Sequence, residues 1–401
     1  MPHPFIPFHL PSIGDEEVRE VEATLRSGWL TTGPRTARFE REFGAYVQSP
    51  HTLAVNSCTA GLHLALAALN IGAGDEVITT PLTFCSTVHT IMQVGAKPVL
   101  ADVGPDSNID PGEIKKAITP RTRAILPVHL AGLPCEMSAI WDLARRFDLR
   151  VIEDAAHAAG SHYRGRPIGA APADGASASD AIVFSFYATK NMTTGEGGMI
   201  ATPCESLAAR MRILLLHGMS RDAWNRYAEA GKWYYEVVDS GFKYNLSDLQ
   251  SAVGIHQLRK LDSFIETRAR YAAMYSRMFS EVEELEIPAD APHVRHSWHL
   301  YILRLRTDLL NINRSEFIDE LHQRGIGTSV HFIPIPLHPH FVRHGLAQYN
   351  CTNAINLYSR SISLPLYPGM TEDQVHYVAD SVKEIAAHSR VRRPMLVSYA
   401  S

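Results

Sequence analysis

The chain has 401 residues, of which 45% are hydrophobic and 20% charged, and its formal net charge is −4. These values are ordinary for a globular protein with room for two or three domains, and the balanced charge argues against binding of nucleic acid or of a membrane surface. No apolar stretch approaches the length of a membrane span, and the N-terminus lacks the pattern of a signal peptide. The five cysteines are scattered and form no CxxC pair, which predicts reduced thiols and a cytoplasmic protein.

Short apolar runs alternate with helical patterns from about residue 15 to residue 250. Most of the runs are apolar throughout, which is typical of strands buried on both faces. Helical spacing lies between several of them, as at Leu62, Leu66 and Leu69. We therefore predict an α/β fold with a mainly parallel seven-stranded sheet wrapped by helices. The predicted strands lie at 53–55, 76–80, 98–103, 124–128, 150–154, 181–186 and 198–201.

The pattern changes after about residue 250, where a long helix is predicted over 246–284. It is followed by a strand at 299–305, a helix at 315–324, a strand at 327–332, a proline-rich loop at 334–339, and a closing helix, strand and helix, the last at 371–387. We predict an N-terminal arm (1–14), a large domain (15–250) and a smaller α+β domain (251–401).

Lys190 is the first candidate for chemistry. It follows the apolar run that starts at Ala181 and precedes the glycine-rich turn 194–198, which would let a ligand approach the backbone. Burial there would lower the pKa of the amine and free it as a nucleophile, whereas the alternative is a solvated surface lysine.

Asp154 ends an earlier apolar run, at the strand end where ligands bind in open α/β sheets. A carboxylate there would favour a protonated pyridine ring, although a helix N-cap is the alternative. A strand-end lysine paired with a strand-end aspartate is what an enzyme of pyridoxal 5′-phosphate (PLP) needs.

Further candidates accompany this pair. The segment that contains Ser57 opens a predicted helix, where hydroxyls and free N–H groups could hold a phosphate or simply cap the helix. Ser185 could add a hydroxyl, Phe84 could stack on a cofactor ring, and His157 could bond a ring oxygen, with core packing as the alternative for each. Their order along the chain, each at a strand end, favours the PLP interpretation.

The sequence predicts neither a dinucleotide-binding site nor a metal site. The glycines of segment 71–76 precede a strand and lack the third glycine of a dinucleotide fingerprint. The histidine groups 293/296/299 and 331/338/340 lack the ligand spacing of a metal site.

With these residues in view, the chain resembles the DegT/StrS family of PLP-dependent nucleotide-sugar aminotransferases over nearly its full length. Within that family it is most similar to enzymes that aminate C4 of a nucleotide-linked 4-keto sugar, such as the UDP-4-amino-4-deoxy-L-arabinose enzyme. The stretches that carry the resemblance are 27–34, 57–59, 153–157, 185–190, 195–198, 241–248 and 363–366.

The resemblance implies the fold of aspartate aminotransferase (PLP fold type I) and a homodimer with active sites at the subunit interface. It implies that Lys190 bonds covalently to PLP and that Asp154 binds the pyridine nitrogen. Many members carry glycine at the position of Cys58 and glutamine at that of His157. The other implied contacts are Phe84 and His157 at the ring, Cys58, Thr59, Ser185 and Asn245 of the neighbouring subunit at the phosphate, and Thr31, Thr32, Arg226 and His331 at the substrate.

The activity implied is transfer of an amino group from L-glutamate to the C4 keto group of a nucleotide-linked sugar, for amino-sugar and surface-glycan biosynthesis. Amination at C3, a cyclitol substrate, and a PLP-binding regulator without turnover remain as alternatives. Related dehydratases carry histidine in place of the lysine, so Lys190 argues against that reaction.

Overall fold

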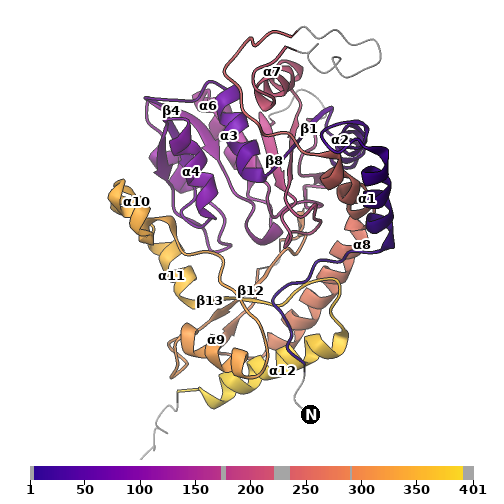
Figure 1. Cartoon of the computed structure of the whole chain (residues 1–401). Coiled ribbons are helices and arrows are strands. Elements are labelled where there is room, and N and C mark those ends of the chain that lie inside the picture. The colour runs from indigo at the N-terminus through magenta and orange to yellow at the C-terminus, as the bar shows by residue number, and fades with distance from the viewer. Residues whose placement is uncertain (1–3, 173–177, 221–234, 290, 392–401) are drawn as a thin grey trace, which may run out of the picture.

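The computed structural model describes residues 4–172, 178–220, 235–289 and 291–391 (Figure 1). A seven-stranded sheet, in the order β1-β9-β8-β5-β4-β2-β3, forms its centre. The strands are β1 (His51–Val55), β2 (Glu76–Thr79), β3 (Lys97–Leu100), β4 (Thr122–Leu126), β5 (Arg150–Asp154), β8 (Ala181–Ser185) and β9 (Gly198–Thr202).

The sheet is parallel except at β9. The pairs β2–β3, β2–β4, β4–β5 and β5–β8 are parallel, whereas β9 runs antiparallel to both β8 and β1. The carboxyl ends of β1, β8, β5, β4 and β2 therefore share one edge. This confirms the predicted α/β fold with a mainly parallel sheet.

Helices cover both faces of the sheet. One hydrophobic cluster joins the sheet to α2, α5, α6 and the first half of α8, and another joins it to α3, α4 and α7. The helices are α1 (Asp15–Ser27), α2 (Pro34–Val47), α3 (Cys58–Ala68), α4 (Cys85–Gln93), α5 (Pro111–Ala117), α6 (Met137–Phe147), α7 (Glu205–Leu215) and α8 (Asp248–Phe279).

The C-terminal part has a cluster of its own around a small sheet, β10-β12-β13. The 32-residue helix α8 links the two parts, because Ile255 and Ile265 pack on the large sheet while Tyr271 and Phe279 pack in the second cluster. The proposed domain boundary near residue 250 stays a prediction. The remaining elements are β6 (His162–Tyr163), β7 (Arg166–Pro167), β10 (Leu285–Glu286), β11 (Val294–Arg295), β12 (Tyr301–Leu305), α9 (Arg314–Gln323), α10 (Pro339–Arg343), α11 (Thr352–Arg360), β13 (Ser361–Leu364) and α12 (Glu372–His388).

One predicted strand is wrong. Segment 327–332 forms only a single bridge, between Ser329 and Ser363, and no strand. The prolines at 334 and 336, which cannot donate to a sheet, follow it at once, and the bridge of Ile326 with Ile6 of the N-terminal arm precedes it. Among the described residues, no helix has the length and apolarity to cross a membrane.

Candidate active site

The carboxyl ends of three strands meet at one edge of the large sheet. Ser185, the last residue of β8, lies opposite Gly198 of β9, and Gly198 lies opposite Val55, the last residue of β1. Asp154, the last residue of β5, pairs with Val183 of β8. The segments that follow β1, β5 and β8 therefore start side by side, where ligands bind in sheets of this kind.

Lys190 lies in the turn after β8, where its backbone N–H donates to the carbonyl of Tyr187 at 2.9 Å. The residue is partly exposed, and in the part of the chain that the structure describes its Nζ makes no hydrogen bond. Protein around the amine lowers its pKa to about 8 by burial, while Cys58 and Asp154 act in the opposite direction. The amine can thus lose its proton close to neutral pH, as a nucleophilic lysine must.

Both carboxylate oxygens of Asp154 are held. Oδ2 accepts from Thr87 Oγ1 at 2.8 Å, and Oδ1 accepts from the N–H of Ala156 at 3.1 Å. Burial raises the pKa of this carboxyl, and the Thr87 and Ala156 bonds and the charge of Lys190 oppose the rise. Thr87 was not predicted; its only signal in the sequence is a hydroxyl about one helical turn after Phe84.

The N-terminus of α3 follows β1 directly. Ser57 caps it, because its Oγ accepts from the N–H of Ala60 at 3.1 Å. The N–H groups of Cys58 and Thr59 have no partner among the described residues. Gly198 packs tightly against them, since a Cβ at that position would lie 2.9 Å from the Cys58 nitrogen. Ser57 therefore caps the helix, while the N–H groups of Cys58 and Thr59 stay available to an anion.

The side chain of Cys58 points toward the carboxylate and not outward. Its Sγ lies 3.9 Å from Asp154 Oδ1 and 3.7 Å from the carbonyl oxygen of Val183, and burial raises the pKa of the thiol well above its usual range. The predicted phosphate contact of Cys58 would therefore have to come from its backbone N–H. Ser185 is buried, and its Oγ accepts a long bond of 3.4 Å from the N–H of Tyr187, so its hydroxyl hydrogen is available to a ligand.

His157 is oriented by a backbone bond. Its Nδ1 accepts from the N–H of Ala131 at 3.2 Å, so a neutral ring carries its hydrogen on Nε2. Burial, then the charges of Lys190 and His331, lower the pKa of His157 well below its usual value. His157 can thus offer a neutral N–H donor, as the glutamine of many family members can.

Phe84 precedes α4 and is 57% exposed, unusually high for phenylalanine. Its ring centroid lies 5.9 Å from that of Phe332, which stacks at 5.8 Å on His157. Phe84, predicted to stack on the cofactor ring, and His157, predicted to bond the ring oxygen, therefore both lie next to the ring of Phe332.

The segment that follows α1 meets the segment that precedes α8. Thr32 Oγ1 accepts from Asn245 Nδ2 at 2.6 Å and donates to the carbonyl of Leu246. Asn245 forms a bridge with Val55 of its own chain. Thr32 was predicted to contact the substrate and Asn245 the cofactor phosphate. The two residues lie together, next to the end of β1.

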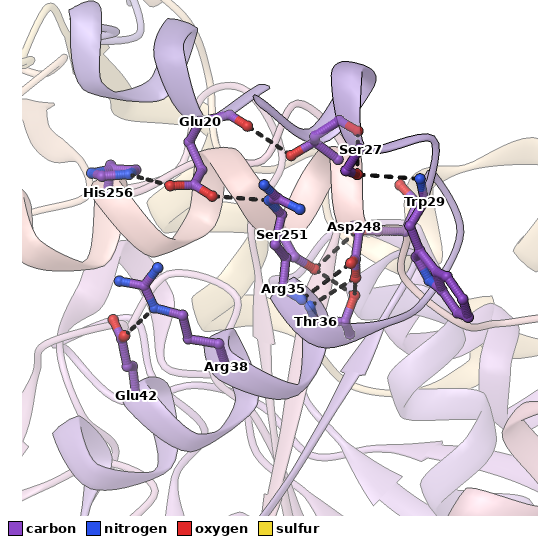
Figure 2. Close-up of polar contacts among 12 residues, drawn as sticks. Glu20, Ser27, Trp29, Arg35, Thr36, Arg38, Glu42, Asp248, Ser251 and His256 are labelled. Atoms are coloured by element: carbon purple, nitrogen blue, oxygen red, sulfur yellow. Dashed lines mark hydrogen bonds and ion pairs between the residues drawn. The ribbon is translucent and has the colours of Figure 1, made fainter. Parts of the chain in front are cut away.

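Asp248 anchors this segment (Figure 2). Its carboxylate accepts from the N–H of Arg35 at 3.1 Å and from the N–H and hydroxyl of Thr36 at 2.9 and 2.7 Å. The backbone carbonyl of Thr31 accepts from the N–H of Asp248 at 3.2 Å. These bonds, of which the two from Thr36 are buried, fix the start of α2 on the start of α8 and hold residues 31–32 in place.

His331 comes from the C-terminal part of the chain. Its Nδ1 lies 2.8 Å from Ser363 Oγ, and its ring stacks on Phe8 with centroids 5.5 Å apart. Burial and the charge of Lys190 lower the pKa of His331 to about 4, so it is neutral beside the lysine. Arg226, the remaining predicted substrate residue, lies outside the described residues.

These groups fit PLP. A lysine amine with a lowered pKa, a buried carboxylate that a protonated pyridine nitrogen would stabilise, and free N–H groups for a phosphate lie at one edge of the sheet. Cys58, Asp154 and Lys190 are close enough to influence one another's pKa values. No group of three potential metal ligands occurs within the described ranges.

Comparisons with known proteins agree with this chemistry. The model of the DegT/DnrJ/EryC1/StrS aminotransferase family matches residues 11–383. The chain is 49% identical over 384 residues, 95% of this chain and 97% of the relative, to the spore coat polysaccharide biosynthesis protein SpsC of Bacillus subtilis.

The chain is also similar, over nearly its full length, to proteins of known structure. The PLP form of Spr1654 from Streptococcus pneumoniae, a proposed sugar aminotransferase, superposes with a TM-score of 0.86 at 32% identity, covering 96% of this chain and 99% of that one. DesV of S. venezuelae superposes with a TM-score of 0.87 at 35% identity, covering 97% and 100%. The chain therefore belongs to the DegT/DnrJ/EryC1/StrS aminotransferase family and is a PLP-dependent aminotransferase.

Proposed function

We propose that the enzyme moves an amino group from L-glutamate to the C4 keto group of a nucleotide-linked sugar, for amino-sugar and polysaccharide biosynthesis. The observation that carries the proposal is a lysine of lowered pKa, in the turn after β8, close enough to buried Asp154 at the end of the adjacent strand β5 to feel its charge. The name of SpsC, which refers to a spore coat polysaccharide, supports the glycan pathway.

Lys190 serves two roles in the proposal. It holds the cofactor covalently, and once released it acts as the base that moves a proton to and from the substrate carbon. When bound, PLP supplies an electron sink through its protonated ring. Asp154, held by Thr87, keeps that ring protonated, and neutral His157 donates to the ring oxygen.

The remaining predicted residues bind the cofactor phosphate, cover its ring or face the substrate. Ser185 and the N–H groups of Cys58 and Thr59 bind the cofactor phosphate, and Phe84 covers the ring. The substrate side is formed by the segment of Thr31 and Thr32, by His331, and by Arg226, whose fork suits a diphosphate.

The enzyme is proposed to be a cytoplasmic homodimer in which Asn245 completes the neighbouring subunit's phosphate site. Exposed apolar side chains one or two positions from site residues support an interface: Trp29 is 39% exposed, Leu30 43% and Tyr187 47%. All five cysteines are free, which suits a reducing compartment.

The test is turnover with defined substrates. Purified PLP-loaded protein should lose its yellow colour with L-glutamate and release 2-oxoglutarate, and should then aminate one member of a panel of UDP-, dTDP- and GDP-linked 4-keto and 3-keto sugars. Mass spectrometry detects the product, and NMR assigns the carbon that carries the amine.

The outcomes separate the alternatives. Amination at C3, or of a cyclitol only, would replace the C4 assignment. Colour without any amino transfer from a panel of amino donors would favour a regulator that binds PLP. The Lys190→Ala variant is the control, since it should neither take up PLP covalently nor turn over.

A further inference from the structure

A small cavity with both polar and apolar walls lies beside Lys190, on the side where residues 9–12 of the N-terminal arm line it. It leaves about 10 Å³ for the centre of a water molecule, which is the space for about one water. The residues that line it are His9, Leu10, Pro11, Ser12, Lys190, Asn191, Thr193, Gln257, Phe264, Arg268 and Pro368.

Two buried side chains in the cavity wall have an atom without a protein partner. Arg268 is 1% exposed; its Nη1 donates to backbone carbonyls, including that of Leu366, but its Nε has no partner within the described chain. Asn191 is 4% exposed; its Nδ2 donates to the carbonyl of Ser297 at 2.9 Å, which fixes the amide and leaves Oδ1 without a partner there. Unpaired buried polar atoms are costly, so such a pair points to a bound molecule.

The N-terminal arm brings a third such atom. It is anchored on one side by Ile6, whose N–H donates to Gly325 at 2.8 Å, and on the other by Ser12, whose carbonyl accepts from Gln257 Nε2 at 2.7 Å. Between these anchors lies His9, and its Nε2 has no partner in the described residues. In Figure 1 the arm runs from the C-terminal part to the start of α1.

The hydrogen-bonding character of His9 follows from its surroundings. The backbone carbonyl of Ala188 interacts favourably with its charged form, which makes that carbonyl an acceptor of a ring N–H. Because Nε2 has no partner among the described residues, we assign the ring hydrogen to Nδ1, on the side of that carbonyl. Burial, together with the charges of Arg268 and Lys190, lowers the pKa of His9 to about 3, so Nε2 is an acceptor at neutral pH.

We propose that the cavity holds one resident water that accepts from Arg268 Nε and the Lys190 amine and donates to Asn191 Oδ1 and His9 Nε2. His9 is then a positioning residue: it orients the water, and the water holds the lysine amine whenever the cofactor does not. Two donors and two acceptors match the four bonds of one water molecule. An anion such as chloride fits less well, because it has no hydrogen to give to Asn191 or to neutral His9.

The first test is crystallographic and does not depend on the sugar substrate. Crystals of the full-length enzyme should show one solvent peak within about 3.2 Å of Arg268 Nε, Asn191 Oδ1 and His9 Nε2. Bromide-soaked crystals should show no anomalous peak at that position. An empty cavity, or a bromide peak in it, would overturn the proposal.

The second test measures Lys190 itself in the full-length enzyme loaded with pyridoxamine phosphate, in which the lysine amine is free. Competitive acetylation at a series of pH values, read by mass spectrometry, gives the midpoint at which Lys190 becomes reactive. A water that donates to His9 is a better acceptor for the lysine ammonium, so His9→Phe should lower the midpoint by about half a pH unit.

Two further variants sharpen this test. His9→Gln restores a polar group near the position of Nε2 and should return the midpoint to the wild-type value. Phe5→Ala changes an exposed residue of the same arm, which packs on His322 outside the cavity, and should leave it unchanged. An unshifted midpoint in His9→Phe, or the same shift in all three variants, would overturn the role of His9.

Discussion

Burial and the neighbouring charges shift the pKa of Lys190 in opposite directions. Burial removes water from the ammonium, whereas Cys58 and Asp154 favour its charged form, and burial prevails. A lysine that stayed at its ordinary value near 10.5 would be almost wholly protonated at neutral pH and a poor nucleophile. The fold thus prepares the amine before any ligand arrives.

The pH dependence of cofactor uptake tests this balance. Since only the neutral amine attacks the aldehyde, the rate of PLP uptake by the apoprotein should rise with pH through a midpoint of about 8 and level off above it. Stopped-flow absorbance measures the rate at each pH. A rate that keeps rising toward pH 10 would mean that burial does not lower the lysine pKa.

Thr87→Val tests the hydrogen bond to Asp154. Loss of the 2.8 Å bond should raise the Kd for PLP about tenfold, the usual cost of one hydrogen bond to a charged group. Thr90→Val is the matched control, because Thr90 lies on the same helix and donates only to the carbonyl of Thr87. Equal Kd values in the two variants, measured by fluorescence titration, would show that Thr87 does not support the site.

Sequence reasoning found some of these residues and missed others for a physical reason. Lys190 and Asp154 each end or follow an apolar run, so chain-local patterns reveal them. Thr87 meets Asp154 across 67 positions, and His9 lines the same cavity as Lys190 only because the arm passes the lysine on its way from the C-terminal part to α1. Contacts of that kind depend on packing between elements, which local patterns do not encode.

Among the elements, the row formed by β1, β9 and β8 determines how closely a phosphate can approach α3. The register places Gly198 between Val55 and Ser185, and a Cβ at Gly198 would lie 2.9 Å from the Cys58 nitrogen. The strands of this row were predictable because each contains an apolar run, at 53–55, 181–184 and 199–201. The segment at 327–332 was not, because its single bridge depends on Ser363 from a distant strand.

Gly198→Ala tests that close approach. The new Cβ would lie 2.7 Å from the carbonyl oxygen of Phe184 and 2.9 Å from the Cys58 nitrogen, both backbone atoms. The variant should lose about 1–3 kcal/mol of unfolding free energy and bind PLP more weakly. Gly72→Ala is the control, since its nearest atom lies at 3.4 Å. Urea unfolding and PLP titration measure both effects, and a variant as stable as the control would refute the tight packing.

At the scale of the whole molecule, α8 and the N-terminal arm join the two parts around the site. The helix contributes to both hydrophobic clusters, and the arm pairs with Ile326 before it passes Lys190. A second subunit is proposed to complete the phosphate site through Asn245.

Hybrid dimers test that sharing. Lys190→Ala and Asn245→Ala homodimers should each be nearly inactive, whereas reassociated mixtures should regain about a quarter of wild-type activity, because half of the dimers are hybrids with one intact site. Mixtures that stay inactive, although native mass spectrometry detects the hybrids, would place Asn245 in the site of its own chain.

The central claim, that Lys190 carries the cofactor, is tested most directly by reducing the PLP-loaded enzyme with borohydride and sequencing its peptides by mass spectrometry. We expect the added mass of the reduced cofactor on Lys190 and on none of the other seven lysines. Reduced cofactor found on a different lysine, or an unmodified Lys190 in protein that is saturated with PLP, would contradict the account.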